Sequence, residues 1–166
     1  FILEWVKTAN SALVTKPSLK AEAFFSPGET CRDVIIRQIQ SAVRQLKICV
    51  FTISDDQISD AISLSHKKGV AIQILTDNDK LFDAGSDIGR LASEGITVKV
   101  DNTSDHMHHK FMVVDEQSLI TGSYNWTRSA AKFNHENIIL TREPGLAKSF
   151  LKEFERLWGQ MGEYKP

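Results

Sequence analysis

The sequence predicts an α/β protein with a central mixed, mostly parallel sheet and helices on both faces. Between residues 30 and 100, amphipathic and apolar segments alternate as they do in helix–strand crossover units. Residues 110–122 instead read as a hairpin, and residues 144–161 carry apolar side chains at helical spacing. A chain of 166 residues suits one domain, so we expect a single domain over residues 1–166, with a helical N-terminal extension over residues 1–19.

The individual elements follow from local patterns. Apolar residues at positions 31, 35, 39, 42 and 46 predict a first helix, with Thr30 and Asp33 placed like a capping box. A second helix has acidic residues at its start and ends at Gly69. Helices are expected over residues 30–46, 54–69, 87–95 and 144–161. Strands are expected over residues 47–53, 70–76, 96–100, 109–115, 118–122 and 136–141.

The charge balance excludes a strong overall field. Lysine and arginine total 20 against 21 acidic residues, so any polyanionic partner must be met by a local patch. The two cysteines, Cys31 and Cys49, make neither a disulfide framework nor a structural zinc set, and Cys49 lies in an apolar run typical of a reduced core thiol.

The sequence says little about location. No run approaches the ~20 apolar residues that a membrane span needs, and the start does not resemble a signal peptide. A cytoplasmic location is favoured. Because the chain begins at Phe1 and not at methionine, a missing N-terminal signal or membrane anchor is the alternative.

Three histidines and a lysine crowd the start of a strand that otherwise reads as buried, in the segment "HMHHKFMVVD". Because side chains alternate along a strand, His108 and Lys110 are expected on one face, with His109 and Asp115 on the other. One imidazole and one ammonium group thus share a face.

A second group of hydrogen-bonding side chains follows the next strand. Ser123 and Asn125 lie two positions apart, so in an extended chain their side chains are expected on the same face. They follow directly after Gly122, where the backbone can approach a ligand closely. Together with Lys110, they offer a charge, an amide and a hydroxyl. Such a set suits a tetrahedral anion, so we expect a phosphate group as the ligand.

These residues resemble a known signature. The stretch "HHKFMVVD" followed by "GSYNW" matches the H-x-K-x4-D-x6-G-S-x-N pattern of the phospholipase D superfamily. The blocks "AFFSPGETC", "TDND" and "NHEN" also resemble, in order, those of its single-motif branch, which contains Nuc-type endonucleases and the Zucchini enzymes, or mitochondrial cardiolipin hydrolases. The matched positions of the signature are His108, Lys110, Asp115, Gly122, Ser123 and Asn125.

The resemblance implies a phospholipase D/nuclease fold and hydrolysis of phosphodiesters through a phosphohistidine, without a metal or other cofactor. It implies His108 as the nucleophile, with Lys110, Ser123 and Asn125 holding the phosphate. Glu136 in "NHEN" matches the position that supplies the carboxylate that orients the nucleophile.

Two positions of the motif, Asp115 and Gly122, are expected to be structural. The strand parity of Asp115 directs its carboxylate away from the phosphate, toward loop or backbone groups behind the site.

Because a chain has one such motif and the reaction uses two histidines, the resemblance implies a homodimer with one active site shared across a two-fold axis.

Nucleic acid is favoured over phospholipid as the substrate. The sequence shows no interfacial helix with a strongly basic face and no exposed apolar tract for acyl chains. Arg128 and Lys132 are candidate contacts to a phosphate backbone, and Trp126 and Phe133 are candidates for base stacking, although each fits an ordinary surface or core role. The alternatives are a phospholipase D-type hydrolase that acts on a phospholipid such as cardiolipin, or a non-catalytic nucleic-acid-binding or dimerisation module of a larger protein.

The sequence disfavours a metal site. A zinc site could use His106 and His108 with His135 or Asp105, but Lys110 beside them would repel a divalent cation. The zinc-binding insertion that Zucchini-like members carry after the position of Cys31 is not present in the sequence. The acidic loop "TDNDKLFDAGSD" misses the spacing of a calcium loop and is expected to line the substrate crevice.

Overall fold

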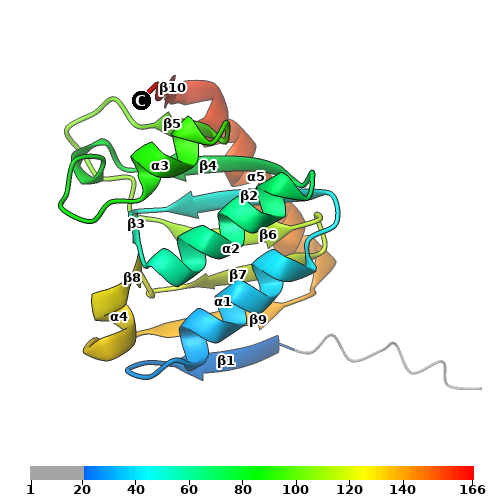
Figure 1. Ribbon diagram of the computed structural model, residues 1–166. Helices are drawn as coiled ribbons and strands as arrows, with labels where there is room; N and C mark the ends of the chain where they lie inside the picture. The colour runs from blue at the N-terminus through cyan, green and yellow to red at the C-terminus, as the bar shows by residue number, and fades with distance from the viewer. Residues whose placement is uncertain (1–20) are drawn as a thin grey trace, which may run out of the picture.

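The computed structural model describes residues 21–166 as an eight-stranded sheet between helices (Figure 1). The N-terminal helical extension expected over residues 1–19 lies outside the described residues. The sheet order is β1-β9-β7-β6-β2-β4-β5-β10, with β3 and β8 forming a separate two-stranded sheet. The strands are β1 Ala21–Phe25, β2 Gln45–Val50, β3 Ile53–Ser54, β4 Ala71–Thr76, β5 Thr97–Val100, β6 Lys110–Val114, β7 Ser118–Gly122, β8 Trp126–Thr127, β9 Asn137–Thr141 and β10 Gly162–Glu163. The helices are α1 Thr30–Ser41, α2 Asp56–Lys67, α3 Ile88–Ser93, α4 Arg128–Lys132 and α5 Pro144–Gln160, with a 3-10 turn at Asn78–Lys80.

The mixed α/β architecture is confirmed, but the expectation that the sheet is mostly parallel is wrong. Within the eight-stranded sheet, β2 pairs in parallel with β4, and β4 with β5. The other neighbours in this sheet are antiparallel. The helix–strand alternation that implies parallel pairing stops near residue 100. Beyond it, a short turn joins β6 to β7 and returns the chain in the opposite direction. The connection from β7 to β9 contains β8 and α4, and β9 also pairs antiparallel with β7.

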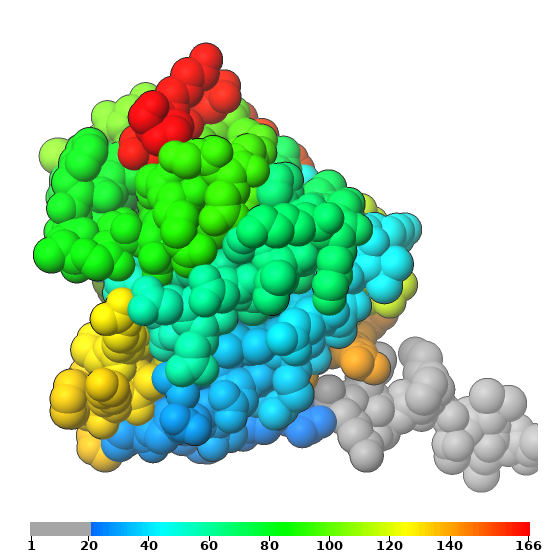
Figure 2. Space-filling model, viewed as in Figure 1, coloured from blue at the N-terminus to red at the C-terminus, as the bar shows by residue number. Residues whose placement is uncertain are grey.

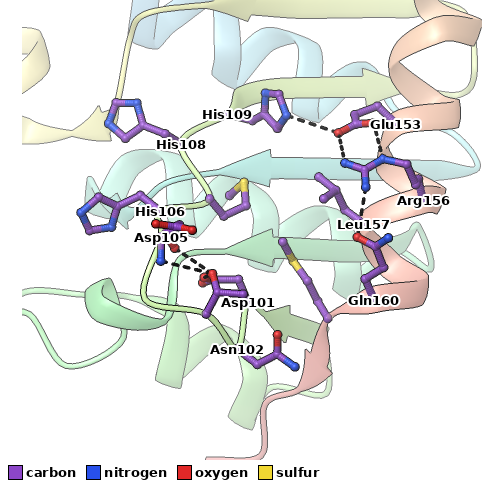
Figure 3. Close-up of a pocket in the computed structure, with 13 residues that line it drawn as sticks. Asp101, Asn102, Asp105, His106, His108, His109, Glu153, Arg156, Leu157 and Gln160 are labelled. Atoms are coloured by element: carbon purple, nitrogen blue, oxygen red, sulfur yellow. Dashed lines mark hydrogen bonds and ion pairs between the residues drawn. The ribbon is translucent and has the colours of Figure 1, made fainter.

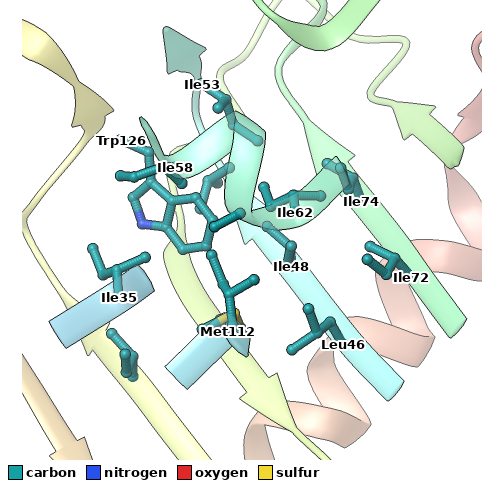
Figure 4. Packing of buried hydrophobic residues seen from close by; sticks show 14 of the residues in the cluster. Ile35, Leu46, Ile48, Ile53, Ile58, Ile62, Ile72, Ile74, Met112 and Trp126 are labelled. Carbon is teal, nitrogen blue, oxygen red and sulfur yellow. The ribbon is translucent and has the colours of Figure 1, made fainter. Parts of the chain in front are cut away.

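Helices cover both faces of the sheet, as expected. Helices α1, α2 and α3 lie on one face and α5 on the other (Figure 1), and the space-filling view shows α1 and α2 in contact along that first face (Figure 2). The larger apolar core lies between the sheet and α1 and α2, where Trp126 packs among isoleucines (Figure 4). A smaller core lies under α5 and contains Phe111 and Phe154.

Two details of the first helix differ from expectation. The helix is capped at Glu29 without a side-chain hydrogen bond, and Thr30 is its first residue, so the predicted capping box does not form. Ala42 already has an extended backbone, and Leu46 lies in β2 instead of the helix. Leu46 fits both patterns because it alternates with Ile48 and Val50 as a buried strand residue.

The topology brings the motif residues to one edge of the sheet. β2 and β4 run in parallel, so their carboxyl ends lie at the same edge. β6 runs the other way, and its first residue, Lys110, pairs with Val50 at the end of β2. The end of β7, Gly122, pairs with Ile138 at the start of β9. Because β6 and β7 are antiparallel, the start of β6 lies beside the end of β7. The residues just before β6, including His108, are therefore close to the residues just after β7.

Among residues 21–166, no helix is both long and apolar enough to cross a membrane.

Candidate active site

His108 and Lys110 form the centre of the site. Lys110, only 8% exposed, opens β6, while His108 lies in the loop just before it. The Lys110 ammonium donates to the carbonyl oxygen of His108 at 2.6 Å and lies 2.9 Å from its Nδ1. The aromatic ring of Phe51 packs against both side chains. The predicted pair is thus brought together, with the imidazole fixed by a buried cation.

The surroundings favour the neutral form of His108. Although His108 is an exposed residue, partial desolvation of its ring lowers its pKa, and the positive charge of Lys110 lowers it further. Burial also lowers the pKa of Lys110, although the negative charge of Glu136 opposes this shift. A neutral imidazole beside an ammonium group combines a nucleophile with a phosphate-binding charge.

Ser123 and Asn125 follow β7 at the same edge. The hydroxyl of Ser123, which is exposed, accepts a hydrogen bond from the backbone N–H of Asn137 at 3.2 Å, and the Ser123 N–H donates to the Asn137 carbonyl at 3.0 Å. The side-chain oxygen of Asn125 is buried. Neither side chain bonds directly to His108 or Lys110 in the described part of the chain, so their role in holding a phosphate stays a prediction.

Gly122 lies where no side chain fits. A Cβ added there would lie 2.1 Å from the carbonyl oxygen of Asn137 and 2.8 Å from the Cα of Ile138. Both are backbone atoms of the paired strand β9 and cannot turn aside. Glycine therefore lets β7 and β9 approach closely just before the segment that carries Ser123.

Asp115 has the structural role that its parity predicts. Its carboxylate accepts hydrogen bonds from the backbone N–H groups of residues 43, 44 and 45, at 2.9, 2.8 and 2.8 Å. Asp115 and Glu116 both have positive φ, 50° and 62°, as a tight hairpin turn between β6 and β7 requires. The carboxylate thus ties this turn to the start of β2, away from His108.

Glu136 lies near the site without touching His108. Its charge reaches Lys110, but its side chain has a hydrogen bond of 3.5 Å from Asn134, and none joins it to His108 within residues 21–166. The backbone N–H of Glu136 donates to the Ser26 hydroxyl at 3.1 Å. The orienting role of Glu136 therefore stays a prediction.

The candidate nucleic-acid contacts differ in exposure. Arg128 and Lys132 are both exposed. The Arg128 guanidinium donates to the Asp56 carboxylate at 2.7 Å, which neutralises part of its charge, and Lys132 lies in the last turn of α4. Trp126 is 1% exposed and belongs to the core, so it cannot stack on a base. Phe133 is 73% exposed and remains available for stacking.

The zinc set considered from the sequence does not assemble as described, because residues 101–109 form a loop and not a strand face. His106 instead lies with its Nδ1 3.3 Å from Asp77 and 3.8 Å from Asp79, a group whose ligand atoms all lie within 4.8 Å of one another. Asp77 is buried and accepts a hydrogen bond from the N–H of Met107 at 2.9 Å, so it holds the peptide that leads to His108. Sequence reasoning missed this contact, although the "TDND" turn after β4 was a usable signal.

A pocket of about 480 Å³ lies beside the site, between the loop of residues 101–109 and α5 (Figure 3). The His109 ring is directed toward Glu153 of α5, whereas the rings of His106 and His108 are directed away from that helix (Figure 3). His108 thus borders the pocket, whereas Lys110 is not among its lining residues.

Comparison with known proteins agrees with the motif. A sequence model of the family described as cardiolipin synthase, PLD-like domain, matches residues 35–158. The mitochondrial cardiolipin hydrolase of Chlamydomonas reinhardtii is 48% identical over 118 residues, 71% of this chain and 53% of that protein. The human mitochondrial cardiolipin hydrolase is 40% identical over 138 residues, 83% of this chain and 55% of that protein.

The fold has a close match in a solved structure. The crystal structure of Nuc from Salmonella typhimurium, a phospholipase D family member, is similar with a TM-score of 0.84 and 27% identity. The match covers 89% of this chain and 99% of Nuc.

The fold and the motif define a member of the phospholipase D superfamily, and the chain belongs to that family. Its single motif and its relatives place it beside Nuc and the mitochondrial cardiolipin hydrolases. The matched region spans 53 to 61% of the length of four of these curated relatives.

Proposed function

We propose that the protein is a metal-independent phosphodiesterase, an endonuclease that hydrolyses DNA or RNA through a phosphohistidine at a site shared by two chains. The observation that carries this proposal is the contact between His108 and Lys110. It places an imidazole with a lowered pKa against a buried ammonium group at an open edge of the sheet. Similarity to Nuc supports the choice of nucleic acid.

The first chemical step uses the neutral form of His108. In the resting contact Nδ1 of His108 accepts from the Lys110 ammonium, so the proton of the neutral ring is on Nε2. When a phosphate takes the donors of Lys110, Nδ1 is released, and the ring loses the Nε2 proton to solvent and takes one up at Nδ1. The Nδ1–H then donates to an acceptor, for which Glu136 is the candidate. Nε2 then attacks phosphorus, forming an N–P bond as the P–O bond to the leaving group breaks. Lys110, with Ser123 and Asn125, stabilises the charge that develops on the phosphate oxygens.

The leaving oxygen needs a proton from the opposite side of the phosphorus. A chain has one histidine in motif register, so we assign this proton to His108 of the partner subunit in its protonated form, which the negative charge of the bound phosphate stabilises. That imidazole then removes a proton from water, which attacks phosphorus and breaks the N–P bond. A homodimer with a two-fold axis through the site supplies both groups.

Hydrolysis of a phospholipid such as cardiolipin is the second candidate. It is favoured by the similarity of the chain to mitochondrial cardiolipin hydrolases. Both candidates need the same chemistry at phosphorus, so they differ in what binds around the site. A non-catalytic module for dimerisation or nucleic-acid binding would leave the buried Lys110 and its contact with His108 without a purpose.

One assay series tests these proposals. The purified protein is incubated with methyl p-nitrophenyl phosphate, single- and double-stranded DNA, RNA and cardiolipin vesicles, each with and without a chelator. We expect turnover of the small diester and of nucleic acid, unchanged by the chelator and lost in His108→Asn.

Other results of these assays would contradict the proposal or select one of the alternatives. Loss of activity with chelator, restored by zinc or magnesium, would contradict metal independence and direct attention to Asp77, Asp79 and His106. Hydrolysis of vesicles but not of nucleic acid would select the phospholipid candidate. No turnover of any diester by the wild-type protein would leave the non-catalytic module.

A further inference from the structure

The pocket beside His108 is not used by the proposed chemistry. It holds about 480 Å³, a size typical of sites for small molecules. The loop of residues 101–109 forms one side and the last turns of α5 form the other (Figure 3). The phosphate-holding candidates Lys110, Ser123 and Asn125 are not among the residues that line it. The pocket is thus available to a part of the substrate other than the reacting phosphate.

One wall of the pocket presents a guanidinium group fixed in its plane. Arg156 donates from Nε and one terminal nitrogen to both carboxylate oxygens of Glu153, at 2.8 and 2.7 Å. Its other terminal nitrogen donates to the side-chain oxygen of Gln160 at 3.0 Å. His109 approaches the same carboxylate, with 3.6 Å between its Nε2 and Glu153.

This arrangement decides how Arg156 can bind. Three of the five N–H groups of Arg156 are already directed to Glu153 and Gln160. The Arg156 side chain nevertheless remains 53% exposed. Besides its two remaining N–H groups it offers the flat face of the cation, and such faces stack on planar aromatic groups.

The remaining lining mixes apolar and polar groups and also includes the carboxylates of Asp101 and Asp105. Met107, Leu157 and Met161 supply apolar and polarisable surface, and thioethers adapt well to aromatic rings. Asn102 adds an amide that can donate and accept in one plane. An acyl chain would instead have to lie against the ionised pair of Glu153 and Arg156, which costs desolvation.

We infer that this pocket is a base-binding subsite, in which a nucleobase of the strand being cut stacks on the face of Arg156 against Met107, Leu157 and Met161. The inference rests on the proposed nuclease function and adds to it the class of group bound beside the phosphate. Sequence-tolerant stacking of this kind is typical of proteins that bind single strands, because every base has an aromatic face.

The test compares two oligonucleotides with the same backbone charge, a short oligothymidylate and an oligomer of the same length whose sugars lack bases. The ratio of their kcat/KM values isolates the contribution of the bases, because contacts to phosphate affect both substrates. We expect the wild-type protein to prefer the oligothymidylate by about five- to a hundredfold, the range that stacking of one base supports.

Two variants should reduce this preference. Arg156→Gln removes the flat cation, and Leu157→Trp fills the pocket, so both are expected to bring the ratio close to one. Lys152→Gln, which removes an exposed charge one turn earlier on α5, is the matched control and should keep the wild-type ratio. Circular dichroism and thermal unfolding confirm that each variant is folded.

The subsite would be disproved by an unchanged ratio in both folded pocket variants, or by an equal loss on both oligomers, which would indicate a backbone contact or a structural role. Loss of cardiolipin hydrolysis in Leu157→Trp, with the oligonucleotide ratio unchanged, would assign the pocket to a lipid and also overturn the inference. If the wild-type protein cleaves neither oligomer, the nuclease proposal fails by itself. Fluorescence anisotropy of the two labelled oligomers then tests the subsite, which predicts the same preference in binding and the same loss in Arg156→Gln.

Discussion

At the scale of single residues, the protonation state of His108 is set by its surroundings. The folded chain favours the neutral ring, because burial and the Lys110 ammonium both lower its pKa below the ordinary value of 6.5. This shift matters for the proposed nucleophile, because only an unprotonated ring nitrogen can attack phosphorus.

We predict that His108 titrates below 6.5 in the folded protein and that Lys110→Gln raises its pKa without restoring the ordinary value, since burial, the larger cause, remains. Because the folded pKa is lowered, the contribution of His108 to stability is full above pH 6.5 and is lost as the pH falls through the folded pKa. Titration of the histidine ring signals by NMR measures the shift directly. A wild-type pKa at or above 6.5 would contradict it.

For Glu136, the position in the motif did not predict its contacts. The motif places it in the sequence, yet its side chain lies within electrostatic reach of Lys110 and makes no bond to His108 among the described residues. The position of Glu136 along the chain therefore does not by itself assign it as the acceptor of the Nδ1 proton.

At the scale of elements, the carboxylate of Asp115 ties the turn between β6 and β7 to the start of β2. Burial alone would raise the pKa of Asp115, but the three backbone N–H groups it accepts, from Gln45, Val43 and Arg44, outweigh burial and lower it. The carboxylate thereby couples the β6–β7 turn to the start of β2 and helps to fix the register that brings Lys110 to the edge of the sheet.

Asp115→Asn should destabilise the fold by about 1–3 kcal/mol, because an amide cannot accept all three hydrogen bonds with the strength of a carboxylate. A carboxylate with a lowered folded pKa stabilises the fold above its ordinary value of 3.8 and loses this contribution as the pH falls further. The variant should therefore lose less stability than the wild type between pH 5 and pH 2. Urea unfolding across this range measures both effects, with Glu22→Gln, at an exposed position on β1, as control. Equal pH dependence in the two proteins would rule out the coupling.

The contact of β7 with β9 depends on Gly122. Gly122→Ala would force a Cβ to 2.1 Å from a backbone oxygen, so the two strands must separate. We expect a loss of about 3 kcal/mol in the free energy of unfolding, together with weaker catalysis, because Ser123 is the next residue.

The control for this substitution is another glycine. Gly159→Ala in α5 meets nothing within 4 Å and should stabilise the helix by up to about 1 kcal/mol. Chemical denaturation of both variants provides the comparison. A Gly122→Ala protein as stable as the wild type would show that the strands can separate at little cost.

At the scale of the whole molecule, the proposed mechanism needs a second chain. One chain supplies one motif histidine, whereas the nucleophile and the acid must lie on opposite sides of the phosphorus. A dimer of wild-type and His108→Ala chains should therefore be nearly inactive, because it retains only one of the two roles.

The measurement uses differently tagged chains, so that mixed dimers are purified and their rate compared with that of the wild-type homodimer. The molecular mass in solution shows whether His108→Ala still assembles. Half the wild-type rate in the mixed dimer, or an active monomer, would mean that each chain carries a complete site.

Much of the fold and of the site was predictable from local patterns. Strand alternation separated Lys110 from Asp115, and the Asp115 carboxylate does accept backbone hydrogen bonds away from His108. The same local reasoning misplaced Leu46 in a helix, because an apolar residue at that spacing satisfies either period. The same reasoning also predicted too many parallel strand pairs. The direction of a strand depends on how it is connected to its neighbours, and the pattern within one segment does not indicate this.

The sequence by itself determined the chemistry available to this protein, because the histidine, the lysine and the glycine-serine-asparagine segment stand at fixed spacings along two strands. Only the tertiary structure decided which of these groups meet, since the antiparallel return of the chain brings the start of β6 beside the end of β7. It also decided that Trp126 belongs to the core and Phe133 to the surface, because packing against α1 and α2 covers one and not the other. The pocket at Arg156 exists for the same reason: α5 lies against a loop that is distant in sequence, and neither segment alone indicates a cavity.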